Sequence, residues 1–110
     1  MEPIFFKDAA ALREWFAEHH ATAPDLLLGI YKKHSVMPSV SLTEAIDEAL
    51  CVGWIDSIER RLDDVSYALR FTPRKARSNW SERNIKRAQD LIARGRMLPA
   101  GLAAFERRRK

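Results

Sequence analysis

The sequence has little cysteine, glycine and proline, and it has no long hydrophobic run. Its 110 residues include one cysteine, four glycines and five prolines. A single cysteine excludes an intramolecular disulfide and a thiolate-rich zinc site, so we expect a reducing compartment, the cytoplasm. The longest apolar run, residues 26–31, is far too short to span a bilayer, and the N-terminus lacks the pattern of a secretion signal. Neither membrane insertion nor export is indicated.

Acidic residues are scarce in the second half of the chain. Residues 67–110 carry thirteen Lys/Arg against three Asp/Glu, whereas residues 1–66 carry six against twelve, and the net charge of the whole chain is +4. Two interpretations are open. The halves can face each other across the fold and partly neutralise, or the second half can present a basic surface to an anionic partner.

The composition is that of one ordinary globular domain. Hydrophobic residues make up 46% of the chain and charged residues 31%. A chain of this length can bury roughly two-thirds of its unfolded surface in a single core. No internal repeat or low-complexity segment is present, so we predict one domain over residues 1–110.

Hydrophobic periodicity predicts the helices. Apolar residues at spacings of three and four follow Asp8, and they follow Ser41, which forms a capping box with Glu44. A third helix is predicted to start between residues 78 and 81, and a short last helix at Pro99. The chain therefore contains three to four helices.

Apolar alternation predicts the strands. Residues 26–33 form a strand that is apolar on both faces and hence central, and residues 3–6 form an edge strand or an N-terminal plug. Residues 54–62 and 66–72 alternate on either side of an Asp-Asp turn, which is typical of a hairpin. We predict an α+β fold with a small, mainly antiparallel sheet of three to four strands.

The hairpin has a predicted register and a predicted site at its ends. If Ile58 lies opposite Leu69, then Asp56 lies opposite Phe71 and Arg60 opposite Tyr67. A hairpin brings its two ends together, so residues 53–56 should meet residues 74–80. We predict a cleft there for a small anionic ligand.

Residue chemistry assigns roles within this cleft. Asp56 interrupts an apolar strand face and needs a donor such as Arg74 or Arg70, either as a structural ion pair or in a cleft. Basic residues just before a helix start favour an anion, although a solvated loop with a serine cap has the same sequence. The predicted ligand-binding residues are Trp54, Asp56, Arg70, Arg74, Lys75, Ser78, Trp80 and Asn84.

Other classes of function are weighed against anion binding. Basic residues dominate positions 70–87, and with Trp80 to stack a base they suggest a nucleic-acid-binding module, although no nucleic-acid motif is present. A protein-interaction domain is a third class. The chain has no histidine beside a nucleophile, no glycine-rich loop and no paired carboxylates, so no enzyme activity is readable. Cys51 ends an apolar helical stripe and is expected to be an inert buried thiol, and no metal or cofactor is predicted.

Three long motifs carry a resemblance to a known family. The runs EAIDEALCVGWIDS (residues 44–57), YALRFTPRK (67–75) and SNWSERN (78–84) resemble the bacterial YdeI/OmpD-associated proteins, also called bacteriocin-protection proteins. The resemblance implies a link to bacteriocin tolerance or envelope stress. Family members are usually longer, with a Lys/Arg-rich helical segment after the position of Gly101, so the chain resembles their N-terminal unit. The matching positions are Cys51, Gly53, Trp54, Ile55, Asp56, Arg70, Phe71, Pro73, Arg74, Lys75, Ser78, Trp80, Ser81 and Asn84.

Overall fold

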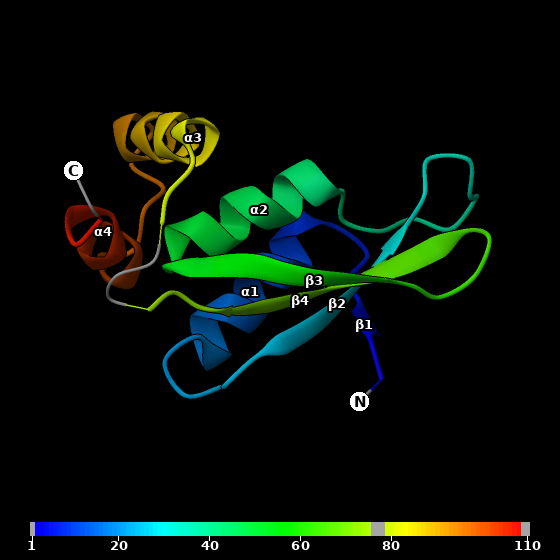
Figure 1. The fold of residues 1–110 in the computed structure, drawn as a ribbon. Helices are drawn as coiled ribbons and strands as arrows, with labels where there is room; N and C mark the ends of the chain where they lie inside the picture. The colour runs from blue at the N-terminus through cyan, green and yellow to red at the C-terminus, as the bar shows by residue number, and fades with distance from the viewer. Residues whose placement is uncertain (1, 76–78, 109–110) are drawn as a thin grey trace.

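A computed structural model describes residues 2–75 and 79–108 of the chain. These residues contain four strands and four helices (Figure 1). In chain order they are β1 (Ile4–Phe5), α1 (Ala9–His19), β2 (Leu26–Tyr31), α2 (Leu42–Cys51), β3 (Trp54–Arg61), β4 (Ser66–Pro73), α3 (Glu82–Ala93) and α4 (Pro99–Glu106).

The strands form one mixed sheet in the order β1-β2-β4-β3. The β2/β4 and β4/β3 pairs are antiparallel, and only the two-residue β1 lies parallel to its neighbour. The predicted α+β fold is confirmed, and so is the internal position of β2. The N-terminal residues form an edge strand, which was one of the two predicted alternatives.

Helix termini follow the capping signals in the sequence. The Asp8 side chain accepts a hydrogen bond from the Ala11 backbone N–H at 2.9 Å, and the Ser41/Glu44 capping box opens α2. Ser81 caps α3, and Pro99 occupies the first turn of α4. The Asp8, Ser41 and Ser81 side chains satisfy backbone donors that a helix start leaves without partners, whereas Pro99 has no backbone donor and a φ that suits a first helical turn.

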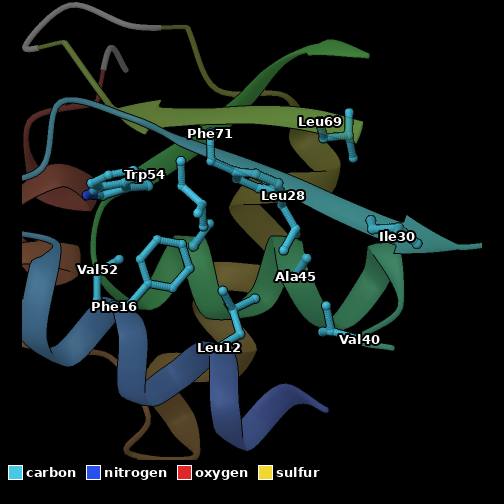
Figure 2. Packing of buried hydrophobic residues seen from close by; sticks show 12 residues of the cluster. Leu12, Phe16, Leu28, Ile30, Val40, Ala45, Val52, Trp54, Leu69 and Phe71 are labelled. Atoms are coloured by element: carbon cyan, nitrogen blue, oxygen red, sulfur yellow. The ribbon is translucent and has the colours of Figure 1, made fainter. Parts of the chain in front are cut away.

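The main core lies between the sheet and the two helices α1 and α2 (Figure 2). Leu12 and Phe16 of α1 meet Leu28 of β2 and Phe71 of β4, and all four are almost fully buried. Helices α3 and α4 lie at the C-terminal end of α2 and close a second, smaller cluster around Leu50, Cys51 and Leu91 (Figure 1). Helix α2 therefore belongs to both clusters.

A β-bulge shifts the register of the hairpin. Asp56 lies opposite Phe71 as predicted, but Leu69 lies opposite Glu59 and Tyr67 opposite Arg61. The expected pairs of Ile58 with Leu69 and of Arg60 with Tyr67 are therefore wrong by one residue. Two residues of β3, 57 and 58, face one residue of β4, and this extra residue reverses the alternation beyond it.

Candidate functional site

The two ends of the hairpin meet, as the sequence predicts. The Arg74 backbone N–H donates to the Gly53 carbonyl at 2.9 Å, and Gly53 has a φ of 78° that favours glycine. Four of the predicted site residues line one shallow indentation: Trp54, Asp56, Arg74 and Asn84. The structure thus brings half of the predicted set together.

Arg74 is held inside the fold at this indentation. Its side chain is 7% exposed, its guanidinium carbon lies 3.8 Å from the centroid of the Trp80 ring, and Nη1 donates to the Asn79 carbonyl at 3.3 Å. Burial lowers the pKa of Arg74 to about 10, while the nearby Asp56 carboxylate acts in the opposite direction. Arg74 therefore remains a cation at neutral pH and joins the end of β4 to the segment before α3.

The indentation has no room for a ligand in this conformation. Its free volume is close to 0 Å³. Trp54 is 1% exposed, packs against Phe16 and Trp15, and donates from Nε1 to the His20 carbonyl at 3.4 Å. Its ring is a core element with no face left for a ligand, because the first residue of β3 points toward α1.

The other predicted site residues lie apart from the indentation or already have partners. Trp80 stacks on Arg74 and meets the Phe105 ring edge-on at 5.5 Å. Arg70 pairs with Asp25 at 3.2 Å, and Lys75 is exposed. Ser78 lies outside the described residues.

Ion pairs connect the acidic and basic halves of the chain. Arg70 binds Asp25, Arg87 binds Asp47 at 3.2 Å, and Arg96 binds Glu48 at 2.6 Å. Each of these pairs joins a base from residues 67–110 to an acid from residues 1–66. The first interpretation of the charge asymmetry, partial neutralisation across the fold, therefore holds for these residues.

A buried carboxylate on α2 was missed by the sequence analysis. Glu48 is 4% exposed, and its two oxygens accept hydrogen bonds from Nε and Nη2 of Arg13, at 3.1 and 2.9 Å, and from Arg96. The position of Glu48 in the sequence could have indicated its burial. Glu48 follows Ala45 by three residues and precedes Val52 by four, so it lies on the apolar stripe of the helix, where a carboxylate needs cationic partners.

A small cavity of about 50 Å³ adjoins this cluster. Cys51 lines it together with Glu48, Arg13 and Arg96. Burial raises the pKa of the Cys51 thiol to about 11, and the Glu48 carboxylate adds to this effect. The thiol is therefore protonated at neutral pH, in agreement with the predicted inert cysteine.

A larger hollow lies where β2 ends and α2 begins. Its volume is about 350 Å³, and we call it the basic pocket. It is lined by Ile30, Tyr31, Lys32, Lys33, Ser41, Leu42, Thr43 and Tyr67. None of these residues was predicted as part of a binding site, although two lysines at the end of the predicted strand 26–33 and hydroxyl residues at the next helix start are visible in the sequence.

Local hydrogen bonds hold the wall of the basic pocket in place. The Lys32 backbone N–H donates to the Val65 carbonyl at 2.8 Å, and the Tyr31 N–H donates to Ser39 Oγ at 3.0 Å. Among the described residues, neither Lys32 nor Lys33 forms an ion pair. In that part of the chain, the two lysines that line the pocket are therefore not bound to a carboxylate.

Several hydroxyl groups of the basic pocket can donate hydrogen bonds. Ser41 Oγ accepts from the Glu44 N–H at 3.2 Å, which leaves its own proton for another acceptor. Burial raises the pKa of Tyr67, with a smaller contribution from Glu59, so its phenol is protonated at neutral pH. Thr43 supplies a third hydroxyl. The polar part of the pocket is thus rich in donors.

The described residues also limit other classes of site. They contain no group of three or more His, Cys, Asp or Glu side chains that could hold a metal ion. No helix in the same residues has the length and apolar character needed to cross a membrane.

The fold and its hollows define a small α+β domain with a candidate ligand pocket at one end of its central strand. A family model described as Domain of unknown function (DUF8412) matches residues 4–104. The chain therefore belongs to the DUF8412 family. No curated protein and no solved structure matches the chain. The resemblance to YdeI/OmpD-associated proteins stays a prediction.

Proposed function

We propose that this domain binds a small anionic ligand, and that the ligand occupies the basic pocket. The ligand class is the one expected from the sequence, but the location differs. The cleft expected at the hairpin ends is closed around Arg74, whereas the basic pocket is open and has a volume of about 350 Å³. Pockets that bind small molecules are typically of this size or larger.

The observation that carries the proposal is the pair of lysines at an open pocket. Nearly buried arginines such as Arg74 have roles inside the fold, but Lys32 and Lys33 line a hollow and bind no acid among the described residues. An ammonium group near a surface attracts an anion by about 1–4 kcal/mol at contact distance, depending on local screening. Hydroxyl donors from Ser41 and Thr43 add directional hydrogen bonds.

Titration of the full chain with simple anions tests this function. We expect phosphate, sulfate and small carboxylates to shift the amide resonances of residues 30–33 and 41–43 in NMR spectra at low salt. The variant Lys32→Gln/Lys33→Gln should weaken binding at least tenfold, because two charge-assisted contacts are lost.

A matched control removes the same charge elsewhere. Lys75 and Lys86 are exposed and do not line the basic pocket. The variant Lys75→Gln/Lys86→Gln has the same net charge as the pocket variant and should bind anions like the unmodified protein. Equal weakening by both variants would show a nonspecific charge effect and would overturn the proposal.

Nucleic-acid binding is the alternative that the same variants distinguish. Exposed Arg83 and Lys86 on α3 and Lys75 nearby support it, but Trp80 already stacks on Arg74. Binding of single-stranded DNA that is lost in Lys75→Gln/Lys86→Gln and kept in Lys32→Gln/Lys33→Gln would favour the nucleic-acid function over the pocket. A protein-interaction role predicts instead co-purification with an acidic partner.

The cellular role follows only from the resemblance. We propose, on that basis, a contribution to bacteriocin tolerance or envelope stress from a cytoplasmic location. Deletion of the encoding gene should then change survival after bacteriocin challenge, and Lys32→Gln/Lys33→Gln should fail to restore it. Full restoration by that variant would separate the cellular role from the basic pocket.

A further inference from the structure

We infer that the ligand of the basic pocket is an aromatic anion, a flat ring that carries one acidic group. This inference rests on the proposed function and names its ligand class. The two kinds of lining residue support it: lysines and hydroxyl residues make one part of the lining, and Ile30, Leu42 and Tyr67 make another.

The volume of the pocket is too large for an inorganic anion alone. A water molecule takes up about 30 Å³ of liquid, so 350 Å³ corresponds to roughly ten waters. Phosphate or acetate displaces only a few of them and leaves the apolar lining wet. A ring attached to the acidic group fills this remaining space and covers apolar surface, which is favourable in proportion to the area removed from water.

The apolar lining is placed to receive a ring. Ile30 is buried and forms part of the lining, while Leu42 stays 37% exposed although it is in the first turn of α2. The Tyr31 ring stacks on Phe5 on the other face of β2, with ring centroids 4.5 Å apart and an interplanar angle of 25°, whereas Tyr67 lies opposite Ile30 and shares its face of the sheet. Because aromatic side chains favour offset-stacked or edge-on contacts with other rings, Tyr67 suits an aromatic guest.

Charge at the pocket limits the ligand to few negative charges. Lys32 and Lys33 supply two positive charges, but Glu44 lies in the same helical turn as Thr43, and Glu59 is close enough to raise the pKa of Tyr67. A polyphosphate would meet these carboxylates, whereas one carboxylate or phosphate group matches the two lysines. Recognition thus combines one charged group with one ring.

The experiment compares matched ligands on the full chain. Benzoate is set against acetate, phenyl phosphate against inorganic phosphate, and benzyl alcohol serves as the neutral ring. We expect each aromatic anion to bind about tenfold to a hundredfold more tightly than its small counterpart, as expected for burial of much of a ring. Benzyl alcohol should bind at least tenfold more weakly than benzoate.

A pair of leucine variants isolates the contribution of the apolar lining. Leu42→Ala should reduce the aromatic advantage, measured as the ratio of phenyl phosphate affinity to phosphate affinity, about threefold to tenfold. Leu102→Ala on α4 is the matched control, because Leu102 is also 37% exposed and lies outside the pocket. It should change neither affinity.

The outcomes separate this inference from the proposed function. If benzoate binds no more tightly than acetate, while acetate still requires Lys32 and Lys33, the aromatic class is overturned and the anion function stands. If no anion binds at all, both are overturned. If benzyl alcohol binds as tightly as benzoate, the requirement for an anion is overturned.

Discussion

Arg96 Nη2 donates a hydrogen bond to Glu48 Oε2 at 2.6 Å, which joins the α3–α4 connection to the buried face of α2. Arg13 of α1 contacts the same carboxylate from the other direction. One side chain of α2 therefore holds two segments that flank it. Neither arginine is as deeply buried as Glu48. The carboxylate is therefore the member of the cluster that depends most on its partners to offset the loss of hydration.

Removing this carboxylate should destabilise the fold. We expect Glu48→Ala to lower the free energy of unfolding by about 1–2 kcal/mol, because its hydrogen bonds to two arginines are lost and a cavity opens. Urea denaturation followed by circular dichroism measures the change. The control Glu18→Ala removes an exposed acid and should stay within about 0.5 kcal/mol. A loss from Glu48→Ala as small as that of the control would contradict a structural role for the cluster.

Gly101 lets α4 pack closely on the end of α2. A Cβ added at Gly101 would clash with the Cys51 carbonyl oxygen, which is backbone and cannot move independently. Gly101→Ala should therefore lower the unfolding free energy by about 1–3 kcal/mol, as overpacking does. Thermal unfolding should show a reduced melting temperature.

Gly29 provides the comparison for this prediction. A Cβ there would lie 2.5 Å from the Phe5 ring, which is the end of a flexible side chain. Gly29→Ala should cost less than Gly101→Ala, and the additional change Phe5→Ala should relieve its steric clash. The opposite order of the two glycine variants would place the tighter contact at the sheet instead of at α4.

The stacking of Arg74 on Trp80 should depend on the planar guanidinium. Arg74→Lys keeps the charge but loses the flat contact at 3.8 Å, so we expect a loss of about 1–2 kcal/mol in unfolding free energy. A double-mutant cycle with Trp80→Leu measures the coupling between the two side chains. A coupling close to zero would show that the ring does not stabilise the cation.

Ionisation of Cys51 should make stability fall at alkaline pH. Burial raises the pKa of the folded Cys51 thiol from its ordinary value of 9.0 to about 11, so the unfolded chain loses this proton first as pH rises. This contribution to stability is complete below about pH 9 and is lost as the pH approaches 11, and it amounts to about 3 kcal/mol. The difference in unfolding free energy between the unmodified protein and Cys51→Ser should be constant from pH 6 to 8.5 and then shift in favour of serine. A constant difference up to pH 10.5 would contradict the raised pKa.

Local signals account for the parts of the fold that could be predicted. Asp8, Ser41 and Pro99 each mark a helix start through backbone geometry or a short-range hydrogen bond. The hairpin ends meet because a single turn joins two alternating runs. The bulge at residues 57 and 58 could not be predicted, since alternation alone does not show where a strand holds an extra residue.

The candidate sites depended on packing between distant segments. Arg74 was identified correctly as a partner of the hairpin end, but its burial follows from contacts with Trp80 and Asn79 that no periodicity shows. The basic pocket lies between the end of β2 and the start of α2, which are neighbours in the fold. Such a hollow is a property of the assembled fold.

The strand order also has a consequence for how the chain folds. The hairpin of β3 and β4 joins neighbours in sequence, whereas β2 pairs with β4 across roughly forty residues, as in the contact of Leu28 with Leu69. Closing the longer loop costs more chain entropy, so we expect the hairpin to form first and the central strand to join it later. Before β2 pairs with β4, one edge of β4 has no neighbouring strand. At this stage of folding, β4 of one molecule can pair with β2 of another, so strand exchange between two chains is most favoured then.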